Sequence, residues 1–204
     1  MKDLFDNYPQ LGYLRPALEQ AVDEAYSSVV KGGKILVCGN GGSAADSEHI
    51  AGELLKGFLK QRPLSREFRA SLQQQGGAGL ADRLQRGIPC ISLVSHSALL
   101  TAVINDNGAE LMYAQQVCAL GRKGDVLIGI STSGNARNVC NAHITANALG
   151  MTTIGMTGES GGRLGELSQI LLNAPASETY RIQEYHIALY HRFCAALEER
   201  LFAE

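Results

Sequence analysis

The segment KILVCGNGGS, residues 34–43, decides the fold. It begins with Lys34–Cys38, which is apolar after its first residue, as is typical of a strand buried in a parallel sheet. Glycines follow at positions 39, 41 and 42, where the missing Cβ lets the backbone turn sharply and approach a ligand. A helix is predicted over Ala44–Lys60, and its first N–H groups and positive dipole end favour an anion. The segment therefore predicts a strand, a ligand-binding loop and a helix.

Strands and helices alternate along the rest of the chain. Further strands are predicted over residues 88–94, 125–130, 152–156 and 169–172, and further helices over 16–30, 97–105, 110–120, 136–149 and 179–202. This alternation implies right-handed crossovers and an α/β fold, a parallel sheet with helices on both faces. Residues 64–87 interrupt it with basic residues, three consecutive glutamines and a Gly-Gly pair, which predicts a helical excursion or a mobile flap.

Composition narrows the class of protein. The 204 residues are 45% hydrophobic and 19% charged, and the net charge of −2 excludes a strong electrostatic attraction to nucleic acid or an anionic membrane. No apolar window approaches the about 20 residues that a membrane-spanning helix needs. Residues 1–10 lack the apolar core of a signal peptide, and the five cysteines contain no C-x-x-C pair. We therefore expect a cytoplasmic protein with no membrane or nucleic-acid partner.

A second polar loop, Ser131–Asn135 (STSGN), also follows a strand and precedes a helix. Three successive hydroxyls and exposed amides suit a phosphate, although they also suit an elaborate helix cap; in the same way Ser43 suits a helix cap and Asn40 a turn. Both loops lie at the carboxyl edge of one sheet, where such folds bind ligands. Neither a G-x-G-x-x-G fingerprint nor a P-loop lysine is present, so a phosphosugar is the favoured ligand.

Four polar residues on two helices are candidates for chemistry. His49 and Glu53 are four residues apart and share a helix face. Gln183 and His191 are eight residues apart, roughly 80° around the last helix, and are expected to lean toward a common point. His186 lies about 140° from His191, so these two histidines are not expected to share a site. Taken singly, such residues are more often structural, and spacing alone predicts a phosphosugar-binding α/β domain.

Several stretches together resemble a known family. The chain is similar to the phosphoheptose isomerases of the sugar isomerase (SIS) fold, a flavodoxin-like three-layer αβα sandwich. The stretches that carry the resemblance are Cys38–Glu53, the Asn105-Asp106 pair, Gly124–Asn135, Met156–Gly162 and Arg181–His191. It covers nearly the whole chain as one SIS domain, residues 1–204, with residues 64–87 as an insertion.

The resemblance implies an activity and a set of roles. It implies conversion of sedoheptulose 7-phosphate to D-glycero-D-manno-heptose 7-phosphate, the entry to bacterial surface heptoses. It implies homotetramers with sites between subunits, and Glu53 and His191 as catalytic residues. It implies one Zn²⁺ per site, bound by His49, Glu53, Gln183 and His191. It also implies phosphate binding by Ser131, Thr132 and Ser133, and substrate contacts from Asn40, Gly41, Gly42, Ser43, Asn105, Asp106 and Gln183.

The expected chemistry also follows from what these side chains can do. Ketose–aldose isomerisation moves a proton between adjacent carbons through an enediol or enediolate. The Glu53 carboxylate is suited to take the carbon-bound proton, and His191 to move protons between the neighbouring oxygens. Zinc polarises a carbonyl and stabilises the oxyanion. Glu53 is then both ligand and base, and the sequence leaves the division between these roles open.

Some positions depart from the family pattern. Tyr180 stands where an acidic residue is expected, Ala136 where a serine is common, and Lys56 is offset from the usual arginine. With the insertion, these changes bear on substrate length and stereochemistry more than on reaction type. Two alternatives stay open: an isomerase of another sugar phosphate, and a non-catalytic relative that binds the replication initiator. The presence of Glu53 and His191 argues against the second.

Overall fold

All five strands of the sheet are parallel. The structure is a computed structural model that describes residues 4–203. Its strands are β1 (Ile35–Gly39), β2 (Cys90–Ser92), β3 (Val126–Ile130), β4 (Thr152–Thr157) and β5 (Ile170–Asn173), in the order β2-β1-β3-β4-β5. This is the flavodoxin-like order, in which the switch point for ligands lies between β1 and β3. The predicted α/β class is confirmed.

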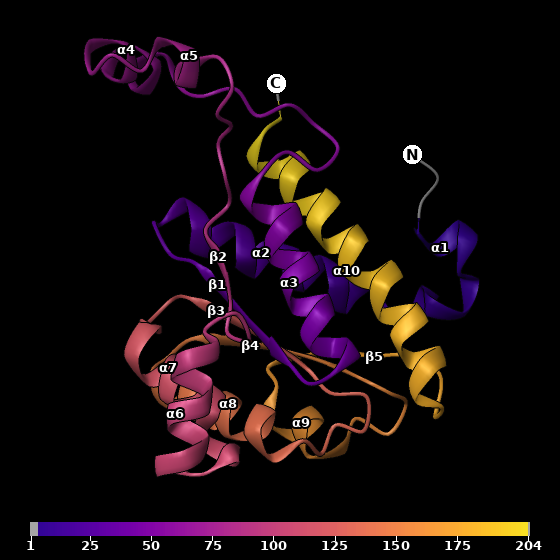
Figure 1. The fold of residues 1–204 in the computed structure, drawn as a ribbon. Helices are drawn as coiled ribbons and strands as arrows, with labels where there is room; N and C mark the ends of the chain where they lie inside the picture. Colours follow the sequence, from indigo (N-terminus) through magenta and orange to yellow (C-terminus); the bar gives the residue numbers. More distant parts are fainter. Residues whose placement is uncertain (1–3, 204) are drawn as a thin grey trace.

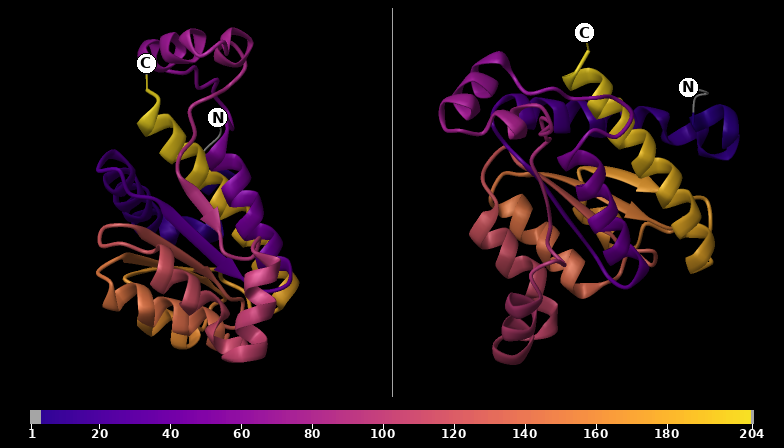
Figure 2. Two further views of the ribbon diagram at one scale, coloured as in Figure 1. Left: turned by 60° about the vertical axis from the view of Figure 1, so that its left-hand side comes forward. Right: turned by 45° about the horizontal axis from the view of Figure 1, so that its top comes forward.

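Helices cover both faces of the sheet (Figures 1 and 2). One layer contains α2 (Arg15–Val30), α3 (Gly42–Leu55) and α10 (Thr179–Leu201), with α1 (Leu4–Asn7) and the 3₁₀ turn η1 (Pro9–Leu14) beside them. The other contains α6 (Ser97–Asp106), η2 (Ala109–Leu111), α7 (Met112–Leu120), α8 (Arg137–Ala148) and α9 (Gly162–Leu167). No helix within residues 4–203 is long and apolar enough to cross a membrane.

Alternate residues of the central strands β1 and β3 supply two apolar cores. Ile35 and Val37 of β1 pack in the core beneath α2, α3 and α10. Leu36 and Cys38 point the other way, into the core beneath α7 and α8. All five residues of β1 are buried, because a strand in the interior of a parallel sheet is covered on both faces. Burial of both cores fixes β1, and with it the loop that follows.

The element boundaries differ from the predicted ones where tertiary contacts compete with helix or strand. The clearest correction is α3, which ends at Leu55 rather than at residue 60. Lys56 is extended, and the N–H groups of Phe58, Leu59 and Lys60 donate to the Glu198 carboxylate on α10 instead of continuing a helix. Similarly, the strand predicted over 88–94 is regular only over Cys90–Ser92.

Residues 64–87 form an arm that stands away from the body (Figures 1 and 2). It carries α4 (Arg66–Gln74), capped by the Ser65 hydroxyl, and the short α5 (Ala78–Ala81). No residue of α4 is buried. The two ends of the arm, where the chain leaves and rejoins the body, are joined by an antiparallel bridge between Pro63 and Gln85. The segment is therefore a helical excursion whose ends leave and rejoin the body at one place.

Two histidines away from the site are buried in the body. Burial lowers the pKa of His143 on α8 to about 3. Burial also lowers the pKa of His186 on α10 to about 4, although a hydrogen bond with the Thr157 carbonyl oxygen opposes it. Both imidazoles are therefore neutral in the folded protein, whereas in an unfolded chain they take up a proton near pH 6.5.

These histidines make the protein sensitive to acid. As the pH falls below about 6.5, these histidines bind protons in the unfolded chain but not in the folded protein, where they are buried. Each histidine therefore lowers the free energy of unfolding by up to about 1.4 kcal/mol per pH unit. We expect the His143→Gln variant to lose stability less steeply than the wild type in urea titrations between pH 6.5 and pH 4.5. Parallel pH dependences of the two proteins would contradict this prediction.

Candidate active site

The first loop connects β1 to α3 at the switch point of the sheet. Gly41 has φ +56°, a conformation that favours glycine, and it is the N-cap of α3. Ser43 lies within the first turn and is buried, so it does not cap the helix. The Asn40 amide exchanges two hydrogen bonds with Asn138 of α8, of 2.9 and 2.8 Å. These bonds tie the first loop to the helix that follows the second.

The second loop, residues 131–135, lies beside the first because Gly39 of β1 pairs with Ile130 of β3. The Ser131 hydroxyl accepts a bond from the Ala136 N–H (3.4 Å), and the Ser133 hydroxyl accepts one from the Asn135 N–H (3.2 Å). Gly134 has φ +67°, and a Cβ there would lie 2.0 Å from the Gly161 oxygen. Close glycine packing therefore holds the loop in place, and two of its hydroxyls already bond to its own backbone.

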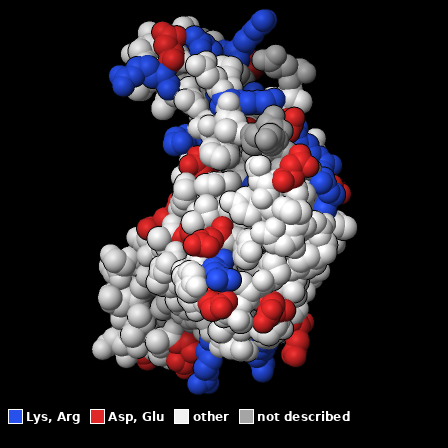
Figure 3. All heavy atoms as spheres, turned by 90° about the vertical axis from the view of Figure 1, so that its right-hand side faces the viewer, with Lys and Arg blue, Asp and Glu red and all other residues white. Residues whose placement is uncertain are grey.

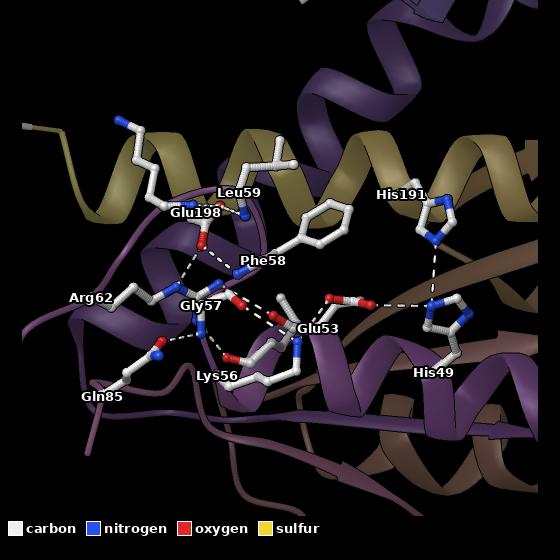
Figure 4. Close-up of polar contacts among 12 residues, drawn as sticks. His49, Glu53, Lys56, Gly57, Phe58, Leu59, Arg62, Gln85, His191 and Glu198 are labelled. Atoms are coloured by element: carbon white, nitrogen blue, oxygen red, sulfur yellow. Dashed lines mark hydrogen bonds and ion pairs between the residues drawn. The ribbon is translucent and has the colours of Figure 1, made fainter. Parts of the chain in front are cut away.

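Helices α3 and α10 lie side by side along their lengths and bring the four candidate residues into two groups (Figure 1). Near the helix starts, the Gln183 side chain lies against Gly42, where an added Cβ would be 2.3 Å from its Nε2. Two turns further along, His49 Nε2 lies 3.2 Å from Glu53 Oε1 and 3.5 Å from His191 Nε2 (Figure 4). The structure therefore brings His49, Glu53 and His191 together and places Gln183 at the first loop.

Tyr190 and Asp46 position the His49 imidazole through its Nδ1 atom, on the side of the ring away from Glu53. The Tyr190 hydroxyl lies 2.9 Å from His49 Nδ1 and donates to Asp46 Oδ1 at 3.3 Å. Since the hydroxyl has one proton and the ionised carboxylate only accepts, the Tyr190 oxygen accepts the proton of His49 Nδ1. His49 Nε2 is directed at Glu53 Oε1 and His191 Nε2. Burial and the nearby Asp46 charge raise the pKa of Tyr190, so it stays protonated.

The surroundings of His191 favour its neutral form. Burial and the neighbouring His49 lower the pKa of His191, while the Glu53 charge opposes them. The Phe58 ring stacks on the imidazole, with centroids 5.7 Å apart. Glu53 Oε2 also lies 3.5 Å from Lys56 Nζ, and the His49 side chain is 45% exposed. The group is therefore a neutral imidazole, a carboxylate and a second imidazole open to solvent on one side.

Other candidates lie apart from this group. Asn105 and Asp106 end α6, are exposed, and bond to each other at 2.8 Å. Among residues 4–203, no hydrogen bond joins them to either loop. His186 is buried against Thr157, away from the group around His49, as its angular separation predicted.

Sequence reasoning missed several residues that shape the site. Asp46 lies three residues before His49 on the same helix face, and Tyr190 directly precedes His191. The spacing in the sequence could therefore have predicted that both lie near the site. No sequence pattern pointed to Asn138, or to Arg62 and Glu198, which pair with each other at the end of α3. Their partners lie far away in the sequence, as with the 136 positions between Arg62 and Glu198.

Comparisons with known proteins agree with this geometry. The chain matches the SIS domain family over residues 12–86 and 77–158. It is 40% identical to the phosphoheptose isomerase of Burkholderia pseudomallei (strain 1710b), over 94% of this chain and 85% of that protein. It is 42% identical to the phosphoheptose isomerase of Aliarcobacter butzleri, over 92% of this chain and 87% of that protein.

Solved structures give the same result. The phosphoheptose isomerase of Neisseria gonorrhoeae superimposes with a TM-score of 0.77 at 34% identity, covering 96% of this chain and 93% of that one. The phosphoheptose isomerase of Francisella tularensis superimposes with a TM-score of 0.77 at 32% sequence identity, covering 96% of this chain and 94% of that one. None of these four relatives supports the initiator-binding alternative. The chain belongs to the phosphoheptose isomerase family of SIS-domain proteins.

Proposed function

We propose that the protein isomerises sedoheptulose 7-phosphate to D-glycero-D-manno-heptose 7-phosphate in bacterial surface heptose biosynthesis. The observation that carries the proposal is the cluster of His49, Glu53 and His191 two helical turns beyond the first loop. Seven residues of α3 separate Gly42 from His49, which is about 10 Å along the helix axis. An extended phosphosugar, with its phosphate and its carbonyl at opposite ends, is suited to such a separation.

In this proposal the two loops bind one end of the substrate and the cluster acts on the other. The Ser131, Thr132 and Ser133 turn holds the phosphate, while Asn40, Gly41, Gly42, Ser43 and Gln183 contact the sugar, and Asn105 and Asp106 reach it in the assembled protein. Glu53 takes the proton from the carbon next to the carbonyl and returns it to the neighbouring carbon. His191, held neutral, moves protons between the two oxygens of the enediol.

The cluster also supports one zinc ion per site, bound by His49, Glu53, Gln183 and His191. Zinc with bonds of about 2.0–2.1 Å holds tetrahedral donors about 3.3 Å apart, close to the two separations around His49 Nε2. Two imidazole nitrogens and a carboxylate oxygen that face one another also favour a cation between them. When bound, the ion supplies a Lewis acid for the substrate carbonyl.

The single chain does not already enclose a metal ion. Among residues 4–203, no group of three or more His, Cys, Asp and Glu side chains is arranged to hold one. Glu53 and His191 each lie beside His49 Nε2, so binding requires their side chains to turn toward each other and requires Gln183 to extend from the first loop. These are rotations of side chains on one open face of α3 and α10.

We also propose a cytoplasmic homotetramer with sites between subunits. A cavity of about 490 Å³ opens beside His191, lined by side chains that include Phe58, Leu59 and Ile187. Ile187 and Leu59 are large apolar residues that stay exposed in the single chain. Figure 3 shows charges of both signs scattered over this side of the molecule, with wide uncharged areas between them. This exposed apolar surface beside the cavity supports the proposal, because a neighbouring subunit would cover it.

The activity is tested on sedoheptulose 7-phosphate in deuterated water. We expect the wild type to form the aldose with solvent deuterium at C2, because the proton that Glu53 takes from C1 exchanges with solvent before a proton or deuteron is delivered to C2. Glu53→Gln and His191→Ala lower kcat by about 10²–10⁴-fold, because each removes a proton-transfer group. The NMR spectrum of the product gives both measurements. Turnover of shorter or longer ketose phosphates alone, or no turnover at all, would contradict the proposal.

The contact of Gln183 with Gly42 gives a second test. In Gly42→Ala the new methyl group displaces the flexible end of Gln183. We expect a raised KM for the sugar phosphate with the melting temperature nearly unchanged. Gly52→Ala is the matched control on the same helix, because a Cβ there meets no atom within 4 Å. It is expected to gain up to about 1 kcal/mol of stability and to keep the wild-type KM.

Removal of metal tests the zinc proposal. After dialysis against a chelator we expect kcat to fall and to return on addition of Zn²⁺. Isothermal titration of the metal-free protein should give one zinc per chain for the wild type and weaker binding for His49→Ala. Full activity in a preparation shown by elemental analysis to be free of metal would remove zinc from the mechanism.

A further inference from the structure

A fully buried carboxylate lies where α3 ends against α10. Glu198 Oε1 accepts hydrogen bonds from the Phe58 N–H (2.9 Å) and from Arg62 Nε (2.7 Å). Glu198 Oε2 accepts from the Leu59 N–H (2.7 Å) and the Lys60 N–H (3.1 Å). Four donors therefore surround one side chain, and Figure 4 shows three of them, from Phe58, Leu59 and Arg62, beside Glu198. Successive backbone N–H groups that point at one anion form a rigid concave site.

Arg62 completes the arrangement from the α3 side. Its Nη1 donates to the Leu54 carbonyl (2.7 Å) and its Nη2 to the Glu53 carbonyl (3.2 Å). These are among the last carbonyls of α3, which a helix end leaves without intrahelical partners. The Arg62 side chain is 0% exposed and that of Glu198 is 1% exposed. The guanidinium is therefore fixed to the backbone of Glu53 at one end and to α10 at the other.

The Arg62–Glu198 pair is linked to both elements that carry the candidate catalytic residues. Glu198 follows His191 by seven residues, two turns along the same face of α10. Arg62 holds the carbonyl of Glu53 itself. We propose that the Arg62–Glu198 pair is a positioning device that sets the distance between the Glu53 carboxylate and the His191 imidazole. The inference deepens the proposed function and rests on it for its kinetic consequence.

The arm is fastened to the same place. The Arg86 N–H donates to the Arg62 carbonyl (2.7 Å), the Ile88 N–H to the Leu54 carbonyl (2.8 Å), and the Gly57 N–H to the Gln85 side chain (2.8 Å). Both ends of the arm are therefore hydrogen-bonded at the turn after α3, whose N–H groups donate to Glu198. The Arg62 guanidinium also lies 4.9 Å from the centre of the Phe202 ring, near the end of the chain. The pair is thus enclosed on several sides and has little freedom to shift.

The fold offers a matched control at the opposite end of the sheet. Asp125 is also a buried carboxylate; it accepts the Lys34 and Arg122 backbone N–H groups, both at 2.9 Å, and pairs with the Lys34 ammonium. It precedes β3, whereas the candidate site lies after the strands. Asp125→Asn therefore removes the carboxylate of a partly buried ion pair, in which the Lys34 side chain is 22% exposed, with no hydrogen bond to α3 or α10.

The experiment compares Glu198→Gln with Asp125→Asn in the full-length, zinc-loaded protein. Each variant is assayed on sedoheptulose 7-phosphate at a temperature well below its own melting point. We expect Glu198→Gln to lower kcat by about 10- to 100-fold, since a displacement of about 1 Å has such an effect, with KM within about twofold. Asp125→Asn keeps the wild-type kcat. Equal kcat losses in the two variants would overturn the inference.

A second readout does not depend on activity. The imidazole ¹⁵N resonances of His49 and His191 are recorded in the metal-free proteins and are expected to shift in Glu198→Gln but not in Asp125→Asn. If the wild type does not turn over the substrate, the proposed function fails, and these resonances alone decide on the positioning device. If Glu198→Gln does not fold, Arg62→Lys replaces it. A lowered kcat with unchanged KM in that variant supports the inference, and a wild-type kcat overturns it.

Discussion

The parallel packing of α3 against α10 is the constraint on which the rest of the structure depends. The two helices touch at their starts through Gly42 and Gln183, in the middle through His49 and His191, and at the end of α3 through Glu198. A rotation or slide of either helix disturbs all three levels at once. Because both helices pack on the same apolar core as β1 and β3, the sheet fixes the position of each helix relative to the other, and with it the distances within the candidate site.

The sheet order explains why polar groups collect at one edge. The chain reverses direction across the sheet between β1 and β3, so the loops after these strands diverge and leave room for a ligand. Asn40 and Asn138 bridge that space, and Gly134 packs closely on the loop after β4. The backbone at the switch point is thus supported from the side before any substrate arrives, which is the condition for binding with little reorganisation.

Local patterns predicted the strand–loop–helix units well because burial on both faces and glycine-rich turns leave a direct mark on the sequence. The spacing of His49 and Glu53 likewise predicted a shared face, and the structure places the two in contact. The end of α3 was not predictable in this way. Residues 56–60 contain one weak helix former, Gly57, and are otherwise ordinary; the extended turn is stabilised by a carboxylate 138 to 140 positions away, which accepts its N–H groups. The positions of Asn105 and Asp106 relative to the site also depend on tertiary structure rather than on spacing.

The bridge between Pro63 and Gln85 has a consequence for how such proteins change over generations. A segment whose two ends meet side by side interrupts neither core, and lengthening or shortening it alters the closure entropy only slightly. The helical part of the arm is therefore a module whose length can change while its two ends, and with them α3 and α10, keep their places. Because no residue of α4 is buried, its sequence can change as readily as that of other exposed surface segments.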